Sequence, residues 1–295
     1  DEIIVPSFTY ISTANVVLYK RAKLVLCDVD ENTFNLTLEE IKKKITKKTK
    51  LIITVDIKGL PIDYDEIKKI KKKYNIPIIC DSAEAFGSEY KNSKVGSQFL
   101  AHSFSFFANK NITTGEGGAI TTNNKKLYNK LKIIRNQGQE GRYNHTHLGN
   151  NYRMTDINAS IGLAQINKIN KIIKDKNLIA KRYNKYFSKI KEIELPVLPK
   201  YVSQHSWYNY CIKVDPKLRD KLIRYLTKNK IETRISFPPI HIQPYYKKNL
   251  IFKKKDFLIS NKIYSQIIDL PIWSGLSLKQ QNYIIRKVSS FFTKK

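Results

Sequence analysis

A single lysine stands beside a glycine-rich turn in residues 104–120, which read FSFFANKNITTGEGGAI. Residues 103–107 alternate small polar and aromatic side chains, a pattern typical of a half-buried strand. Lys110 follows this strand, and three glycines after it permit a tight turn before the apolar run resumes. A lysine that forms a Schiff base must be aimed and partly desolvated, and this setting offers both. On spacing alone a surface lysine is the commoner case, because the chain has many.

An acid follows another candidate strand upstream. Residues 76–80 form a short apolar run, IPIIC, that ends at Asp81. Ligands of an open α/β sheet bind outside the carboxyl ends of its strands, so Asp81 has the usual position of a site residue. It could ligate a metal, cap a helix or pair with a buried cation, and capping is the commonest of these roles. Together with Lys110 it suggests pyridoxal phosphate (PLP), which needs a lysine and a carboxylate that keeps its pyridine nitrogen protonated.

Alternating strands and helices are expected to position these two residues. We predict strands at the N-terminus, at 23–28 and at 51–55, and a helix at 12–21. Thr37 and Asp63 are each followed three residues later by a glutamate, which is a capping-box pattern at a helix start. This alternation favours a largely parallel sheet. A long helix over 163–190 should lead to a second region, with a strand at 207–214 and a helix at 218–229.

Three motifs, in this order, resemble the PLP-dependent nucleotide-sugar aminotransferases of the DegT/DnrJ type. They are ICDSAEAFG (79–87), SFFANKNITTGEGG (105–118) and GNNYRMTDINASIGLAQI (149–166), and the resemblance runs from Asp1 to about Leu270. The second motif is most similar to the perosamine-synthase branch, which aminates C4 of a 4-keto-6-deoxyhexose. The resemblance implies an α/β protein of PLP-dependent transferase fold type I. It would have a large mixed-sheet PLP-binding domain, residues 1–190, and a small C-terminal α/β domain, residues 191–295.

The resemblance also implies roles for residues around the cofactor. Lys110 would hold PLP covalently and act as general base and acid, and Asp81 would face the ring nitrogen. The other implied contacts are a stacking ring, a small residue at the ring face, an acid at the ring hydroxyl and a hydroxyl at the phosphate: Tyr10, Ala83, Glu84 and Ser105. Core packing is an equal alternative for Tyr10. Each residue alone would more often be structural, but the set in register indicates a site.

Two later segments supply the implied substrate contacts. Relatives are obligate dimers in which the segment at 151–156 reaches into the neighbouring active site. We therefore expect Asn151 at the cofactor phosphate and Arg153 at the substrate diphosphate, because the planar fork of arginine donates two bonds at once. Arg234 and His241 would also contact substrate, with a surface loop as the equal alternative. The implied partners are a nucleotide-sugar, L-glutamate as amino donor, and a second copy of the chain in a homodimer.

Composition narrows the class of protein. The chain has 295 residues, 41% of them hydrophobic, with a formal net charge of +29, so nucleic-acid binding has to be considered. The lysine runs at 42–44 and 71–73, however, are flanked by apolar residues at helical spacing, which indicates solvated helix faces. Lysine also far outnumbers arginine, the residue favoured at phosphate-reading surfaces. Nucleic acid is therefore not expected as a partner.

The remaining features point to no metal and no membrane segment. Cys27, Cys80 and Cys211 form no paired motif and are expected to be buried thiols. His145 and His147 lack a nearby acid or cysteine cluster, so loop histidines are expected there. No apolar run has the length of a membrane span and no charged-then-apolar leader is present, so a cytoplasmic enzyme is expected.

Several alternatives stay open. The resemblance implies a preceding segment with a Ser-Gly-Thr turn that grips the cofactor phosphate, so the chain from Asp1 is expected to be a fragment or the product of a truncated gene. A truncated remnant that only dimerises or binds anions is one alternative, and amination at C3 is another. A PLP-dependent keto-sugar dehydratase is disfavoured, because those relatives replace the lysine with histidine. Ile57 and Lys58 depart from the segment that faces the sugar in many relatives, so the sugar is not assigned.

Overall fold

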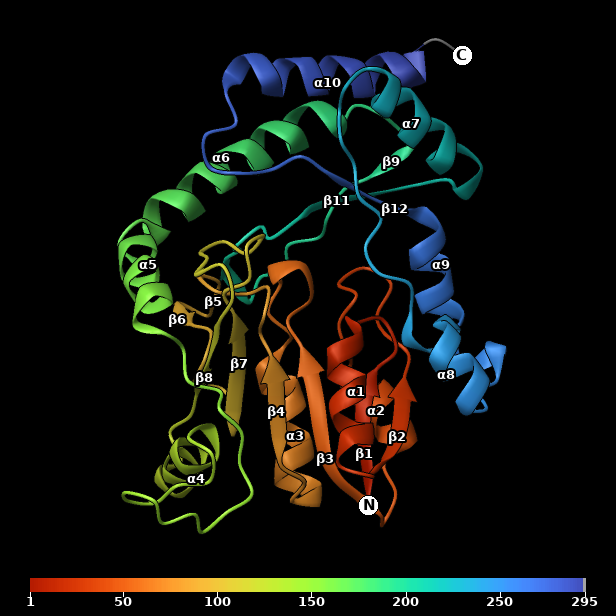
Figure 1. Cartoon of the computed structure of the whole chain (residues 1–295). Helices are drawn as coiled ribbons and strands as arrows, with labels where there is room; N and C mark the ends of the chain where they lie inside the picture. The colour runs from red at the N-terminus through yellow and green to blue at the C-terminus, as the bar shows by residue number, and fades with distance from the viewer. Residues whose placement is uncertain (294–295) are drawn as a thin grey trace.

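A six-stranded mixed sheet forms the lower part of the molecule (Figure 1). The computed structural model describes residues 1–293. The strand order is β2-β1-β3-β4-β7-β8, in which β8 runs antiparallel to β7 and the other neighbours pair in parallel. The strands are β1 (Glu2–Pro6), β2 (Lys23–Cys27), β3 (Thr49–Val55), β4 (Ile78–Asp81), β7 (Ala101–Ser105) and β8 (Gly118–Thr121). The largely parallel sheet is therefore confirmed.

Helices cover both faces of this sheet. Successive side chains of a strand point to opposite faces, so Ile4 and Ile52 pack with α2 (Leu38–Lys44) and α3 (Tyr64–Tyr74). Val5 and Ile53 belong instead to the core against α1 (Ile11–Tyr19). The strands that carry the site are thus packed between two buried layers of mostly apolar side chains.

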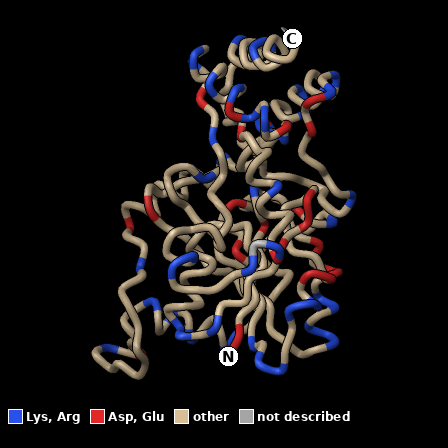
Figure 2. Tube along the Cα trace, turned by 90° about the vertical axis from the view of Figure 1, so that its right-hand side faces the viewer, with Lys and Arg blue, Asp and Glu red and all other residues tan. Residues whose placement is uncertain are grey.

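The lysine-rich helices have the predicted amphipathic form. Thr37 and Asp63 accept hydrogen bonds from the backbone N–H groups of Glu40 and Glu66, which confirms both predicted N-caps. The lysine runs of α2 and α3 lie at the surface or half-buried, whereas Ile41, Ile67 and Ile70 are buried. Figure 2 shows basic residues spread along the trace from the N-terminal sheet to the C-terminal helices.

A smaller sheet lies beyond the carboxyl ends of the large one, at the top of Figure 1. Its order is β12-β11-β9, with antiparallel pairing throughout. Helices α6, α7 and α10 surround it, and their apolar faces form its core. The elements are β9 (Ile193–Glu194), β11 (Tyr210–Val214), β12 (Ile267–Leu270), α6 (Ile169–Phe187), α7 (Pro216–Lys228) and α10 (Leu278–Thr293). Helix α6 contributes to this core although it precedes residue 190. The expected division of the chain at residue 190 stays a prediction.

The remaining elements connect these two bodies or flank them. A third sheet has the order β10-β5-β6, formed by Val202–Gln204, Glu89–Tyr90 and Ser93–Lys94. The other helices are α4 (Lys125–Arg135), α5 (Asp156–Ile166), α8 (Pro244–Asn249) and α9 (Leu258–Gln266). Three short 3-10 turns are η1 (Ile57–Gly59), η2 (Ile240–Ile242) and η3 (Lys254–Phe257).

Two predicted elements differ from the structure. The single helix expected over 163–190 is wrong, because α5 ends at Ile166 and α6 begins at Ile169. The break lets α6 turn its apolar stripe toward the smaller sheet, while no residue of α5 is buried. The strand expected from residue 207 begins only at Tyr210, because Trp207 has a positive φ of 47° that a strand cannot accommodate.

The cysteines are buried, as expected. Cys27, Cys80 and Cys211 are free thiols inside the protein. Burial raises the pKa of each thiol above its ordinary value. Of the helices in residues 1–293, none combines the length and apolar character that crossing a bilayer requires.

Candidate active site

Asp81 is the last residue of β4, at the edge of the sheet that faces the smaller sheet. Its Oδ2 atom accepts a hydrogen bond of 2.7 Å from Thr13 Oγ1 on α1. Its Oδ1 atom accepts one of 3.1 Å from the backbone N–H of Ala83. These two donors fix the carboxylate while leaving it half-buried. Asp81 does not cap a helix, so the commonest alternative for this residue is wrong.

Lys110 lies in the loop between β7 and β8. Backbone hydrogen bonds close the base of this loop, from Phe106 N to Gly117 O and from Thr114 N to Phe106 O, both 2.9 Å. The Lys110 ammonium stands over the ring of Tyr208, 4.3 Å from the ring centroid. A cation over an aromatic face is stabilised by the ring quadrupole. The lysine side chain is only 14% exposed, so the surface-lysine alternative is wrong.

Glu84 provides a second carboxylate beside the lysine. Its Oε1 atom lies 4.0 Å from Lys110 Nζ, and its Oε2 atom accepts a 2.6 Å hydrogen bond from the backbone N–H of Lys58. Burial raises the pKa of Glu84 above its ordinary value, while the positive charges of Lys110 and Lys58 oppose that rise. The site thus combines one amine with two carboxylates in different environments.

A cavity of about 1,340 Å³ adjoins Lys110 on the side of the smaller sheet. The residues of its wall include Lys110, Asn111, Lys176, Tyr208, Arg234 and Asp269. Lys110 thus belongs to the cavity wall and also lies 4.0 Å from Glu84, whereas Asp81 and Glu84 are not part of the wall. The volume exceeds the usual range of about 300–1,000 Å³ for small-molecule sites, which gives room for a large substrate.

Three further residues predicted at the cofactor lie at the same sheet edge. Tyr10 precedes α1 and is 58% exposed, and its ring makes an edge contact with Phe237, so the core-packing alternative is wrong. Ala83 and Ser105 are half-buried, one after the end of β4 and the other at the end of β7. Their roles toward the cofactor stay predictions.

Of the four residues predicted to contact substrate or cofactor from later segments, one lines the cavity and three do not. Arg234 lines the cavity. Asn151 and Arg153 are exposed on the segment before α5, where Arg153 Nε donates to Asn151 Oδ1 at 3.0 Å. His241 is buried with its ring stacked on Phe257 and its Nε2 atom 3.1 Å from Asn261 Oδ1. The cavity of this chain is not lined by Asn151, Arg153 or His241, and their contacts with substrate stay predictions.

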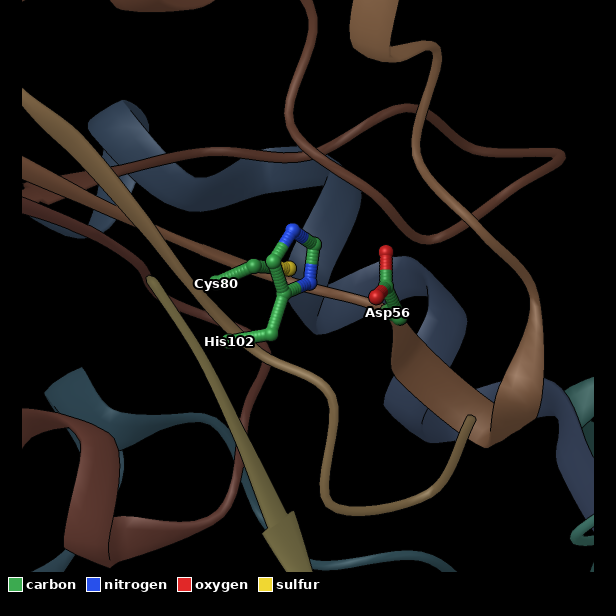
Figure 3. A group of neighbouring side chains, drawn as sticks. All are labelled: Asp56, Cys80 and His102. Carbon is green, nitrogen blue, oxygen red and sulfur yellow. The ribbon is translucent and has the colours of Figure 1, made fainter. Parts of the chain in front are cut away.

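A buried polar cluster beneath the site joins Asp56, Cys80 and His102, whose side chains point toward one another in Figure 3. His102 Nε2 accepts a hydrogen bond from Phe99 N–H at 3.2 Å, so the ring proton is on Nδ1 and faces Ser82 Oγ at 2.9 Å. Ser82 Oγ in turn donates to Asp56 at 2.6 Å. Burial lowers the pKa of His102 to about 4. Both ring nitrogens are thus used, and the cluster supports the ends of β4 and β7 rather than forming a metal centre.

Four residues at the site were missed by sequence reasoning. Thr13 holds Asp81, and Tyr208 lies under Lys110. Asn111 accepts a 2.6 Å hydrogen bond from the buried ammonium of Lys176. Asn111 could have been found from the sequence, because it directly follows Lys110. The other three reach the site from other elements, and no spacing rule in the sequence points to them.

This edge of the sheet suits PLP on the chemistry of its donors. It offers an amine and a carboxylate at the ends of the neighbouring strands β7 and β4, a second acid beside the amine, and an exposed aromatic ring. A lysine and a carboxylate partner for the pyridinium nitrogen are the groups that a PLP site requires. The fold and the site define a PLP-dependent transferase of fold type I.

Comparisons with known proteins agree with this assignment and identify a family within the PLP-dependent transferases. The model of the DegT/DnrJ/EryC1/StrS aminotransferase family matches residues 1–289. GDP-perosamine synthase of Escherichia coli O157:H7 is 37% identical over 297 residues, covering 100% of this chain and 80% of that protein. Helicobacter pylori PseC, an aminotransferase involved in the biosynthesis of pseudoaminic acid, superposes with a TM-score of 0.92 at 28% identity, covering 100% of this chain and 80% of PseC. Spr1654 of Streptococcus pneumoniae, solved in its PLP-form, superposes with a TM-score of 0.92 at 30% identity, covering 100% of this chain and 81% of Spr1654.

The chain belongs to the DegT/DnrJ/EryC1/StrS aminotransferase family. It is a PLP-dependent sugar aminotransferase. The family resemblance and the fold type expected from the three sequence motifs are thereby confirmed.

Proposed function

We propose that this enzyme transfers the amino group of L-glutamate to the C4 keto group of a nucleotide-linked 4-keto-6-deoxy sugar. The observation that carries the proposal is the position of Lys110, which lies 4.0 Å from the carboxylate of Glu84 and lines a cavity of about 1,340 Å³. The likeness to GDP-perosamine synthase over the whole chain supports the choice of sugar and of C4. Amination at C3 is the alternative that product analysis would reveal.

The residues of the chain take distinct roles in this proposal. PLP, when bound, supplies an electron-accepting ring that stabilises negative charge at the reacting carbon. Lys110 would bind it covalently, and its free amine would then move the proton at the reacting carbon as base and acid. Asp81 would hold positive charge at the ring nitrogen through its own negative charge. Glu84 and Ser105 would bind the ring hydroxyl and the phosphate, and Tyr10 and Ala83 would contact the ring faces.

The substrate side of the proposal uses basic residues. Arg234 would bind the nucleotide-sugar from the cavity wall, and Arg153 and Asn151 would reach the site of a second copy of the chain. The support for a homodimer is α5, which follows these two residues and has no buried residue. Its Ile157 and Leu163 side chains are 75% and 68% exposed. An exposed apolar helix of this kind is a surface that a second copy would cover.

Mixing the protein with PLP and then with L-glutamate tests the proposal directly. We expect a visible absorption band that Lys110→Ala abolishes and that L-glutamate bleaches, with 2-oxoglutarate released. The matched control is Lys48→Ala. It removes an exposed lysine just before the start of β3, at the end of that strand remote from the site. A set of nucleotide-linked 3-keto and 4-keto sugars would then be offered. Bleaching by L-glutamate without amination of any 4-keto sugar would contradict the proposed substrate, and absence of the band would contradict the role of Lys110.

A further inference from the structure

Lys58 is a buried lysine that has no role in the proposed reaction. It lies in η1, directly after β3, and is only 5% exposed. Its backbone has a positive φ of 57°, a left-handed conformation that is unfavourable for a residue with a side chain. A buried charge in an unfavourable backbone conformation persists only where the surroundings determine it strongly. Lys58 is therefore expected to have a specific role in the protein.

The side chain of Lys58 crosses from the large sheet to the smaller one. Its Nζ atom lies 2.7 Å from Asp269 Oδ1 on β12, and it also donates to Ser236 Oγ. The second oxygen of Asp269 accepts hydrogen bonds from Ser236 Oγ at 2.7 Å and from Asn209 Nδ2 at 2.8 Å. Burial opposes the charged form of Lys58, but the attraction of Asp269 outweighs it and raises the pKa of the lysine. The two residues therefore form a buried ion pair with its hydrogen bonds satisfied.

The backbone of the same residue reaches the active site. The Lys58 N–H group donates to Glu84 Oε2 at 2.6 Å, and the other oxygen of Glu84 lies 4.0 Å from Lys110 Nζ. On the far side of the ion pair, the backbone of Asp269 exchanges two hydrogen bonds with Arg234, of 3.1 and 2.8 Å. Arg234 lines the cavity that adjoins Lys110. Lys58 thus connects the carboxylate beside the Lys110 amine to Asp269 and Arg234 in the cavity wall.

We propose that Lys58 is a positioning residue, which fixes Glu84 against Lys110 and joins this part of the site to the cavity wall through its ion pair with Asp269. The inference rests on the proposed roles of Lys110 and Glu84. A direct contact between Lys58 and the sugar is a poorer account, because the ammonium is buried and already bonded to Asp269 and Ser236.

If Lys58 positions Glu84, removal of its charge should change the pKa of Glu84, which a purely structural role would not do. The groups facing it are Lys110, Lys58, Asp81 and Tyr208. Burial raises the pKa of Glu84, the two lysines lower it, and Asp81 raises it. Removal of the Lys58 charge should therefore raise the pKa of Glu84, so that this carboxylate becomes protonated at a higher pH.

The experiment compares Lys58→Met with Lys213→Met. Lys213 is also a buried lysine and lies outside the cavity wall, but its partner Glu194 in the smaller sheet is exposed, so it is a control for loss of a buried lysine charge. The measurements are the PLP dissociation constant from the visible band, the midpoint of its loss at acid pH, and the thermal unfolding of the protein without PLP. We expect Lys58→Met to weaken PLP binding about tenfold and to move the acid midpoint up by about one pH unit. Lys213→Met should lower thermal stability without changing either quantity.

Two further variants keep the test decisive. Lys58→Arg retains the positive charge and should leave the acid midpoint near its wild-type value. If Lys58→Met does not fold, the double variant Lys58→Met with Asp269→Leu removes both buried charges and should still show the raised midpoint. Loss of stability in Lys58→Met with an unchanged dissociation constant and acid midpoint would overturn the inference. A wild-type protein without a Lys110-dependent band would instead contradict the proposed function, so the two failures are distinct.

Discussion

The amine of Lys110 lies 4.0 Å from the carboxylate of Glu84, although the two residues belong to loops that follow different strands. Strands β4 and β7 are neighbours in the sheet, so the loops after them meet at one edge. The lysine charge opposes the effect of burial on the Glu84 carboxylate. This electrostatic coupling underlies the pH dependence expected for Lys58→Met, which removes the other positive charge that acts on Glu84.

Asp81→Asn should retain the fold but slow the reaction. The amide keeps an oxygen that can accept the hydrogen bond from Thr13, but it lacks the negative charge that stabilises a protonated ring nitrogen. A neighbouring opposite charge shifts a pKa by about 1–3 units, so the half-reaction with L-glutamate should slow by roughly 10²-fold. Stopped-flow absorbance measures this rate, with the exposed-helix variant Asp65→Asn as control. An unchanged rate in Asp81→Asn would show that the charge of this residue has no part in the reaction.

Lys176 should make stability depend on alkaline pH. Its side chain is 6% exposed, it donates to Asn111, and burial lowers its pKa to about 8. Between about pH 8 and 10.5 the unfolded chain binds a proton that the folded protein does not, so this group's contribution to stability rises with pH. The free energy of unfolding of wild type minus that of Lys176→Met should increase by about 3 kcal/mol over this range. Urea unfolding at a series of pH values measures the difference, and a flat difference would mean that the amine is not desolvated.

Gly59→Ala should disturb the site through contact. Gly59 has a φ of 87°, and an added Cβ would lie 2.1 Å from Ser206 Oγ and 2.9 Å from the backbone oxygen of Glu84. Gly115→Ala is the matched control, since its φ is 78° but an added Cβ meets no atom within 4 Å. Both variants have the strain of a left-handed residue, about 1–2 kcal/mol. Gly59→Ala should lose about 1–3 kcal/mol more and bind PLP more weakly, as measured by denaturant unfolding and absorbance. Equal losses in the two variants would count against contact as the cause.

Leu163→Glu on α5 should shift the protein toward the monomer. The new charge would have to be desolvated in an apolar interface, and that cost is large for an unpaired carboxylate. Leu258→Glu is the control, because Leu258 is similarly exposed at the start of α9, on the opposite side of the molecule in Figure 1. Sedimentation velocity gives the oligomeric state. A wild-type monomer, or a dimer unaffected by Leu163→Glu, would contradict the proposed interface.

The sheet and the central pair of site residues could be predicted because their signals are local. Short apolar runs, capping residues and a glycine turn are read within a few positions, and parallel strands bring their carboxyl ends together. Asp81 and Lys110 are therefore found where the sequence placed them. The break between α5 and α6 was missed because both segments favour helix, and only the packing of α6 on the smaller sheet distinguishes them.

Long-range contacts explain what sequence reasoning missed. Lys58 and Asp269 are 211 positions apart, and neither residue carries a pattern that announces the other. Tyr208 reaches Lys110 only because the chain turns at Trp207 in a left-handed conformation. The burial of His241 and the stacking of its ring on Phe257 are likewise not revealed by spacing alone, and its contact with substrate stays a prediction.

The rate at which the three buried cysteines react with a thiol reagent reports how often the protein opens. Cys27 lies on β2, Cys80 on β4 and Cys211 on β11 of the smaller sheet, but all three pack in one hydrophobic core. Burial raises the pKa of each thiol. Alkylation requires an exposed thiolate, so a thiol reagent can react only when the surrounding core opens. Mass spectrometry of each cysteine over time would therefore show whether this shared core, to which both sheets contribute, opens as one unit or in parts, with no added label.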